Sequence, residues 1–420
     1  MPPRLFQVSR SQLAGEVRLS GAKNSALRLL AASILTAEPV RLRNYPAGLL
    51  DARVHVEMLE ALGKSCEVSP DAIRIREAKP LATRLEYPGR SIRNTLLILG
   101  ALTARFGCGA VPLPGGCKLG ERTYDLHVHV LESLGARVWE EGEHLCAEAR
   151  DGRLRGAEIH LALRSTGATE NAILAASLAC GTTRLWNPHV RPEILDLIAF
   201  LREMGARITV RGQESIVIEG VADLTGARHW VIPDNVEALT WLVGSVITGG
   251  DVEIVGFPFE HLEIPLIHLR ESGARFFRGD DRMIVRGGTC YPLDLSTGPY
   301  PGINSDMQPL LAVYGALAQG ETRITDLRFP GRYGYAEELA KMGLRHEVVG
   351  DMLRIHGGTP LRGAEVNALD LRAGIALVLA GLTADGTTTI AEAWQIERGY
   401  DRFLEKIQAL GGKVRAGEES

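Results

Sequence analysis

The sequence predicts an α/β protein built from six copies of one unit. A short phrase close to Leu-x-x-Leu/Met-Gly recurs at intervals of about 70 residues, as expected for one supersecondary unit repeated along a chain. Each phrase ends on a glycine that closes a helix, and the six glycines are Gly63, Gly135, Gly205, Gly273, Gly343 and Gly411. Copies of this kind are stable because each buries its apolar face against its neighbours.

Each unit has the same order of elements. An apolar helix is followed by a glycine-containing turn, a short strand, a loop, and an amphipathic helix that ends at the marker glycine. The expected apolar helices are residues 25–37, 94–106, 171–180, 238–248, 307–319 and 373–385. The expected short strands are residues 40–42, 110–113, 183–185, 252–254, 322–324 and 388–390. Further strands such as 207–210 and 215–219 follow the amphipathic helices.

The two ends of the chain complement each other. Few residues follow Gly411, whereas the chain starts with two strands, 6–8 and 16–19, that have no helix ahead of them. We therefore expect the start of the chain to complete the last unit. Because 420 residues exceed what one hydrophobic core usually organises, we expect two domains with a hinge between them. The expected domains are residues 22–229, and residues 1–21 together with 230–420.

The composition is that of an ordinary globular protein, with 45% hydrophobic, 23% charged and 5% aromatic residues. A net charge of −4 gives no support for a nucleic-acid or membrane partner. No apolar stretch approaches the ~20 residues of a membrane span. The start of the sequence shows no hydrophobic signal core, so we expect a cytoplasmic protein. The six cysteines lack Cys-x-x-Cys spacing, which argues against disulfides and structural zinc.

Charged and polar residues gather at two recurring loops of the unit. The loop before the apolar helix carries Lys23, Asn24, Arg93, Ser165, Thr166, Gly167, Asp234, Asp306, Asp370 and Arg372. The loop after the short strand carries Cys117, Arg122, Glu193, Arg332 and Arg398. Helix N-termini with basic side chains beside them attract phosphates and carboxylates, so we expect a polyanionic substrate. Helix capping alone would explain the Asp and Ser residues but not the basic ones.

The loop 113–120, LPGGCKLG, carries the candidate reactive group. Its glycines allow a tight turn with Cys117 near the tip, and the neighbouring Lys118 and Arg122 would lower the pKa of that thiol. Cys117 is therefore a candidate nucleophile or general acid. The other five cysteines lack basic neighbours, and we expect them to pack as small hydrophobes: Cys66, Cys108, Cys146, Cys180 and Cys290.

Six motifs together resemble a known family over nearly the whole chain. They are LSGAKNSAL (19–27), ARFGCGAVPLPGGCKLGERTYDLH (104–127), STGATENAILAA (165–176), SDMQPLL (305–311), DLRAGIALVLAG (370–381) and IERGYDRFLEKI (396–407). In this order and spacing they resemble the UDP-N-acetylglucosamine enolpyruvyl transferases, the first committed enzymes of peptidoglycan synthesis. The resemblance implies two inside-out α/β domains, each of three repeated units, with a cleft between them.

The resemblance also implies a reaction. These enzymes add the enolpyruvyl group of phosphoenolpyruvate to a hydroxyl of the uridine nucleotide and then eliminate phosphate, without a metal or organic cofactor. Lys23, Arg122 and Arg398 match the positions that bind phosphoenolpyruvate, and Arg93 and Arg372 are nearby. Cys117 matches the cysteine that protonates the methylene carbon and can hold a covalent phospholactoyl adduct.

The remaining matches concern the acceptor and the reaction chamber. Asp306 matches the carboxylate beside the attacking hydroxyl, and Asp370 matches a second acidic residue there. The segments that cradle uridine and its phosphates correspond to Arg122, Thr123, Tyr124, Asp125 and Leu126, and to Ser165, Thr166 and Gly167. Asn24 and Arg328 match positions that contact the sugar, and Arg332 lies in the same group of substrate-binding positions.

The chain departs from the family on the acceptor side. The usual Ala-Arg-Glu-Pro-Glu is His189-Val190-Arg191-Pro192-Glu193, the usual Pro-Asp-Arg ends in Asn235, and Leu50 replaces a polar residue. The usual Phe-Met-His is Tyr333-Gly334-Tyr335, which we expect near the diphosphate-sugar end together with Arg191 and Asn235.

These departures leave alternatives to UDP-N-acetylglucosamine open. Some antibiotic producers use a paralogue to enolpyruvylate uridine monophosphate, and Arg191 could then meet a terminal phosphate. A catalytically silent homologue that binds a uridine nucleotide is a further alternative. The PGGCKLG loop argues against the shikimate-pathway enolpyruvyl transferase. The sequence leaves the oligomeric state open.

Overall fold

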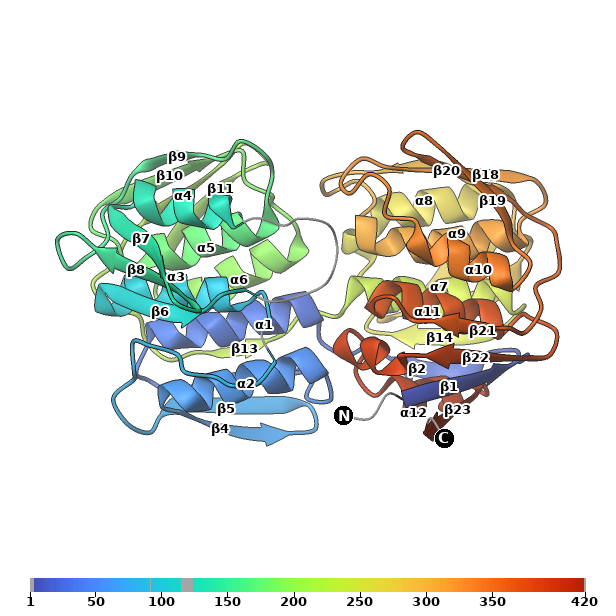
Figure 1. Cartoon of the computed structure of the whole chain (residues 1–420), viewed down its shortest axis with the longest axis horizontal. Helices are drawn as coiled ribbons and strands as arrows, with labels where there is room; N and C mark the ends of the chain where they lie inside the picture. The colour runs from blue at the N-terminus through green and yellow to red at the C-terminus, as the bar shows by residue number, and fades with distance from the viewer. Residues whose placement is uncertain (1–3, 91, 115–123, 419–420) are drawn as a thin grey trace. The chain divides into compact units, whose positions relative to one another are not determined.

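A computed structural model of the chain describes residues 4–90, 92–114 and 124–418 and divides into two compact units (Figure 1). Unit A is Gly21–Ile232, and unit B combines Met1–Ser20 with Pro233–Ser420. The chain therefore passes between the units twice, after Ser20 and after Ile232. The expected domain boundaries lie within three residues of these passages.

Unit A contains three sheets within its described residues. Two of them have four strands, in the orders β13(Arg228–Trp230)-β3(Val40–Arg43)-β5(Ala72–Glu77)-β4(Lys64–Ser69) and β9(Glu158–His160)-β10(Thr182–Trp186)-β12(Ser215–Glu219)-β11(Arg207–Arg211). The third has the order β6(Cys108–Pro112)-β8(His144–Ala149)-β7(Ala136–Glu141). The edge strands β13 and β9 run parallel to their neighbours, whereas the remaining pairs are antiparallel.

The helices of unit A lie inside its sheets. The apolar helices are α1(Lys23–Ala32) with the 3-10 turn η1(Ser33–Leu35), α3(Thr95–Phe106) and α5(Thr166–Ser177). The amphipathic helices are α2(Leu50–Leu62), α4(Asp125–Ser133) and α6(Pro192–Glu203). Every residue of α5 from Ala168 to Ser177 is buried, as expected for a helix surrounded by protein on all sides.

Unit B repeats this plan with three four-stranded sheets among its described residues. Their orders are β2(Ala14–Arg18)-β14(Asp251–Val255)-β16(Arg282–Gly288)-β15(Ala274–Arg278), β17(Asp294–Thr297)-β18(Glu321–Asp326)-β20(Met352–His356)-β19(Arg345–Val349) and β21(Glu365–Asn367)-β22(Thr387–Ala391)-β1(Arg4–Ser9)-β23(Lys413–Glu418). The apolar helices are α7(Asn235–Ile247), α9(Gln308–Leu317) and α11(Leu371–Gly381). The others are α8(Glu263–Glu271), α10(Gly334–Lys341), α12(Phe403–Ala409) and the 3-10 turns η2(Phe259–His261), η3(Ser305–Met307) and η4(Ala393–Arg398). All of α11 is buried, so the expected inside-out arrangement is confirmed for both units.

The six marker glycines share one backbone conformation. Each follows an amphipathic helix and has a positive φ, from 83° at Gly411 to 121° at Gly63. A side chain is strained at such φ values, so the helix ends there and the chain turns into the next strand. The repeat seen in the sequence is therefore a repeat of helix-terminating turns.

The start of the chain contributes strands to two sheets. We expected both strands to complete the last unit, and this was wrong for β2. Strand β1 pairs with β22 and β23 in the sheet of the last unit, as expected. Strand β2 instead pairs in parallel with β14. The corresponding edge position beside β3 is taken by β13, which precedes α7 in the sequence. Strands β2 and β13 thus each join a sheet of their own unit while the helix that follows lies in the other unit.

Four apolar helices begin two to five residues earlier than expected: α1, α5, α7 and α11. Helix α5 starts at Thr166 because the Ser165 hydroxyl accepts a hydrogen bond from Ala168 N at 3.3 Å and caps the helix. Helix α1 starts at Lys23 and tightens into η1 after Ala32. No helix within the described residues is long and apolar enough to cross a membrane.

Candidate active site

The predicted binding residues lie at the N-termini of the apolar helices. In unit A, Lys23 and Asn24 open α1, Arg93 precedes α3, and Ser165 caps α5. In unit B, Asp234 and Asp370 cap α7 and α11 through hydrogen bonds from backbone N–H groups at 2.7–2.9 Å. These two carboxylates thus cap their helices, and Asp370 has this capping role in addition to its proposed one.

Lys23 is held by a buried acid at the start of the neighbouring helix. Its Nζ lies 2.8 Å from Oδ2 of Asp51, and both side chains are at most a tenth exposed. Asp51 is in the first turn of α2, and helices α1 and α2 pack together. This pair fixes the ammonium group at the N-terminal end of α1.

A second group in unit A surrounds the N-terminus of α5. Arg93 and Asp125 both act electrostatically on His127, whose pKa is lowered to about 3, first by burial and then by Arg93. The backbone of Gly167 passes so close that a Cβ there would lie 2.9 Å from Nε2 of His127. Thr166 Oγ1 lies 2.8 Å from Nδ1 of His189. The structure therefore brings together two of the predicted uridine-binding segments.

Part of the predicted uridine segment can be placed and part cannot. Tyr124 precedes α4 and its hydroxyl bonds to Glu140, while Leu126 packs against the core of unit A. Cys117, Arg122 and Thr123 lie outside the described residues. Their proposed roles stay predictions from the sequence.

Arg191 is engaged by Glu193 through two contacts. Its Nε and Nη2 lie 2.7 and 2.8 Å from the two carboxylate oxygens, and both side chains are largely buried. Burial would raise the pKa of Glu193, but Arg191 lowers it below its usual value. A second buried ion pair of the same kind joins Arg28 Nε to a carboxylate oxygen of Glu170 at 2.6 Å. Arg191 is therefore part of a compensated ion pair.

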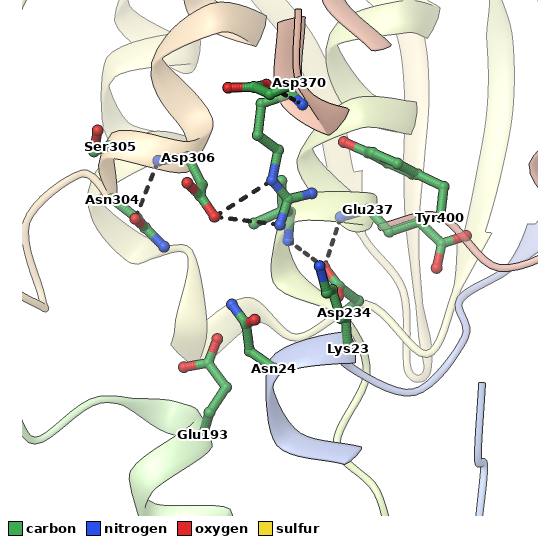
Figure 2. A network of polar contacts seen from close by, with 12 residues as sticks. Lys23, Asn24, Glu193, Asp234, Glu237, Asn304, Ser305, Asp306, Asp370 and Tyr400 are labelled. Atoms are coloured by element: carbon green, nitrogen blue, oxygen red, sulfur yellow. Dashed lines mark hydrogen bonds and ion pairs between the residues drawn. The ribbon is translucent and has the colours of Figure 1, made fainter. Parts of the chain in front are cut away.

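Two arginines of unit B hold the Asp306 carboxylate. Figure 2 shows this carboxylate with two dashed contacts to one of its oxygens, and the backbone N–H of Asp306 donating to the Asn304 side chain. Arg332 Nη1 lies 2.9 Å from Oδ1, and Arg372 Nε and Nη2 each lie 3.3 Å from Oδ2. Asp370 joins the group because its Oδ2 lies 3.5 Å from Arg332 Nη2. Alternating charges in one cluster fix the direction of each side chain. Four of the predicted residues thus form one cluster.

Arg372 is the most buried member of this cluster, with a side chain 2% exposed. Burial alone would lower its pKa, but Asp306, Tyr400 and Asp234 raise the pKa well above its usual value. Its Nη1 has no hydrogen-bond partner among the described residues. A buried guanidinium with an unused donor suits an anionic ligand.

A buried carboxylate that the sequence analysis did not single out supports the cluster. Asp326, fully buried, accepts hydrogen bonds from Ser305 and Gln308 and from the backbone N–H groups of Arg328 and Phe329. These bonds order the turn that carries Arg328 and tie it to the start of α9. The sequence did not indicate this role, because Asp326 lies within a strand and its carboxylate bonds to other parts of the protein.

Tyr333 and Tyr335 are buried, and their expected place near the diphosphate-sugar end stays a prediction. Both side chains are only 4% exposed and their hydroxyls bond inward. The Tyr333 hydroxyl accepts from Asp326 N at 2.8 Å, and the Tyr335 hydroxyl bonds to Gln308. They brace the Asp326 network. Asn235 is likewise buried, as the first residue of α7.

The remaining predicted cation is Arg398 at the end of η4. It is 6% exposed, and its Nη1 donates to Gln395 at 3.0 Å. The described cysteines are free thiols, and burial raises the pKa of Cys66 to about 12 and of Cys290 to about 11. In the part of the chain that the structure describes, no group of His, Cys, Asp and Glu side chains could hold a metal ion.

Comparison with known proteins identifies the family of the chain. The family model for EPSP synthase (3-phosphoshikimate 1-carboxyvinyltransferase) matches residues 8–407. UDP-N-acetylglucosamine 1-carboxyvinyltransferase 1 of Carboxydothermus hydrogenoformans is 42% identical over 99% of both chains. The Caulobacter sp. (strain K31) enzyme of the same name is 40% identical over 98% of this chain and 96% of its own.

Solved structures give the same result for the fold. The enolpyruvyl transferase NikO from Streptomyces tendae matches over 100% of both chains with a TM-score of 0.90 and 27% identity. EPSP synthase from Acinetobacter baumannii covers 99% of this chain and 100% of its own, with a TM-score of 0.78 at 20% identity, and shows the fold alone. The chain is an enolpyruvyl (1-carboxyvinyl) transferase. Within that class, the chain belongs to the UDP-N-acetylglucosamine 1-carboxyvinyltransferase family.

Proposed function

We propose that this enzyme transfers the enolpyruvyl group of phosphoenolpyruvate to a hydroxyl of UDP-N-acetylglucosamine and releases phosphate. The observation that carries the proposal is 38–42% identity, over nearly full length, to relatives named for this reaction. The product would be a peptidoglycan precursor. We propose a cytoplasmic setting because both substrates are products of cytoplasmic metabolism.

The proposed reaction has an addition step and an elimination step. In the addition, a proton from Cys117 adds to the methylene carbon of phosphoenolpyruvate while the acceptor oxygen bonds to the neighbouring carbon. The hydroxyl proton passes to Asp306, and a tetrahedral adduct results. In the elimination, the methyl carbon returns a proton to the Cys117 thiolate, the double bond re-forms, and the carbon–oxygen bond to phosphate breaks. The proton held by Asp306 passes to the leaving phosphate. Inorganic phosphate leaves, so atoms and charges balance.

The charges of the described residues suit these roles. Lys23, with Asp51 fixing its ammonium group at 2.8 Å, and the buried Arg398 would bind the phosphate and carboxylate of the donor. Asp306, gripped by Arg332 and Arg372, would present a fixed oxygen to the acceptor hydroxyl. Arginine–carboxylate pairs of this kind set the direction of the acid before substrate arrives.

Uridine monophosphate is a second candidate acceptor, favoured by one observation. Arg191 occupies a position where the family usually has an acid, and it adds a cation near the proposed acceptor site. Its pairing with Glu193 compensates that charge, so a terminal phosphate would have to displace the carboxylate. This cost favours the sugar nucleotide as acceptor.

Phosphate release measured with both acceptors tests the proposal. We expect phosphoenolpyruvate-dependent phosphate release with UDP-N-acetylglucosamine, at a higher kcat/KM than with uridine monophosphate. A higher kcat/KM for uridine monophosphate would show that uridine monophosphate is the acceptor, and the assignment as an enolpyruvyl transferase would stand. Binding of uridine nucleotides without phosphate release would identify a catalytically silent homologue.

A further inference from the structure

One sheet of unit A exposes a row of arginines. Arg228 on β13, Arg41 on β3 and Arg74 on β5 are direct cross-strand partners, and Arg43 and Arg76 follow two residues on. Their neighbours on β3 and β5 are buried core residues, so all five arginines share the exposed face of the sheet. We call these five residues the arginine face.

The arginine face is poorly compensated. The exposed strand positions facing it include one acid, Glu67 on β4, which lies 3.8 Å from Arg74 and 3.4 Å from Arg76. Arg41, Arg43 and Arg228 form no ion pair with any residue that the structure describes. Like charges directly opposite one another on a sheet destabilise it. The row therefore opposes the stability of the sheet that carries it.

The other sheets show that the fold does not require this row. In the four other four-stranded sheets, the edge-strand residue that corresponds to Arg228 is acidic: Glu16, Glu158, Asp294 and Glu365. The correspondence is exact in backbone terms, because Arg41 N, Arg184 N and Arg323 N each bond to the carbonyl preceding that residue. Beside β18 the acid compensates the facing arginine, since Asp294 lies 3.6 Å from Arg323. The sheet that contains β13 therefore carries a basic residue where the other four carry an acidic one.

An exposed aromatic ring adjoins the row. Trp230 is 60% exposed and lies two residues after Arg228 on the same face, opposite Arg43. Tryptophan and arginine are the residues most enriched among those that dominate binding at protein interfaces. A large apolar ring beside unpaired guanidinium groups fits a partner that brings both carboxylates and some apolar surface.

We propose that the arginine face, with Trp230, docks an acidic segment of a protein partner. Guanidinium groups bind carboxylates through paired hydrogen bonds. Three strands in a sheet span about 10 Å, which matches two or three carboxylates along a short segment. The chain's net charge of −4 and pI near 6.3 disfavour a long nucleic acid or a membrane, which need charge over a larger surface.

A direct test uses the full-length protein and a fluorescein-labelled peptide of alternating glutamate and serine. We expect fluorescence anisotropy to show binding at about 50 mM salt that weakens at about 300 mM salt, because screening shortens the reach of exposed charges. The variant Arg41→Glu/Arg228→Glu should bind the peptide about 10-fold more weakly or worse, since it reverses two contacts. The control Arg211→Glu/Arg345→Glu changes the net charge equally on exposed strand residues opposite Ser215 and His356. It should stay within about 2-fold of the unchanged protein.

A second variant separates binding from folding. Arg41→Gln/Arg228→Gln removes the charges without creating new acids. It should keep or raise the thermal midpoint and retain phosphate release while losing peptide binding. The proposal is overturned if the unchanged protein does not bind the peptide, or if the arginine variants bind it as well as the control does. Tighter binding of an oligothymidylate or of phosphatidylserine vesicles than of the peptide would overturn the assignment to a protein partner.

Discussion

Arg372 grips the Asp306 carboxylate through two nitrogen atoms, Nε and Nη2, each 3.3 Å from the same oxygen. Arg372 lies in the first turn of α11, and Asp306 precedes α9, so this contact joins the N-termini of two apolar helices. Burial of the guanidinium makes the contact insensitive to screening by salt. The direction of the Asp306 carboxylate therefore depends on a residue far away in the sequence.

Loss of this contact should lower turnover more than acceptor binding. In Arg372→Met, Asp306 loses the two contacts that Arg372 makes with its carboxylate and, with them, its fixed direction. Truncating one partner of a buried charge pair typically costs about 2–5 kcal/mol, so we expect kcat/KM to fall roughly 30-fold or more. Steady-state phosphate release measures the change. Arg323→Met, which breaks an exposed pair in the same unit, serves as the control and should leave kcat/KM unchanged.

Lys23 should bind phosphoenolpyruvate in addition to neutralising Asp51. Lys23→Met should raise KM for phosphoenolpyruvate or lower kcat/KM by roughly 30-fold or more, while uridine-nucleotide binding by calorimetry changes little. The double variant Lys23→Met/Asp51→Asn distinguishes the roles, because it removes both charges of the pair. If the double variant recovers activity, Lys23 acts only as the counter-ion of Asp51.

Cys117 should be the reactive thiol of the protein. An epoxide phosphonate that mimics phosphoenolpyruvate should alkylate it, and Cys117→Ser should lose both labelling and turnover. The other thiols provide an internal control, because burial raises the pKa of Cys66 and Cys290 and keeps them protonated. Peptide mass spectrometry locates the label, and a label on any other cysteine would refute the assignment.

The repeat could be predicted from the sequence because it depends on local backbone requirements. Gly205 and Gly273 have φ values of 102° and 92°, which only glycine adopts without strain. The glycines therefore recur in the amino-acid sequence at the same place in each unit. Strand β2 pairs with β14 across more than 200 residues, and no local pattern specifies such a parallel partner. The arrangement of β2 could therefore not be read from the sequence.

The charged residues of the candidate site could be predicted from the sequence. The buried residues that hold them in place could not. Arg332 and Arg372 stood out because helix capping does not explain basic residues in these loops, and Asp306 stood out through the family resemblance. The inward hydrogen bond of Tyr335 and the supporting role of Asp326 were not predicted, because they depend on which way a side chain points. That direction is set by packing between β18, η3 and α10, and it leaves no periodic signal.

Two buried histidines should make unit A sensitive to acid. His55 and His127 are neutral in the folded protein, because burial lowers the pKa of each to about 3. Unfolded histidine binds protons below about pH 6.5, so stability is present above that pH and is lost as pH falls toward 3. At pH 5 each should cost about 2 kcal/mol of unfolding free energy. Urea unfolding at pH 7 and pH 5 measures the loss, and His127→Asn should show a shallower pH dependence.

His229 should have the opposite effect at higher pH. Its two ring nitrogens lie 2.9 Å from Asp196 and 3.0 Å from Glu203, and Asp196 also accepts a hydrogen bond from Ser25 in the first turn of α1. Burial alone would lower the pKa of His229, but the two carboxylates raise it above its usual value. A raised pKa means that the stabilisation is complete below about pH 6.5 and is lost as pH rises through the folded pKa.

The matching measurement compares the protein with His229→Gln between about pH 6 and pH 9. The unchanged protein should lose unfolding free energy over this range, whereas His229→Gln should be less stable at pH 6 and lack that slope. Phe200 packs against the imidazole ring, so Phe200→Leu serves as a packing control that should lower stability equally at both pH values. Because Ser25 connects this network to the turn that holds Lys23, KM for phosphoenolpyruvate should rise with the same pH midpoint. Equal slopes in the two proteins would mean that His229 is not charged between its two carboxylates.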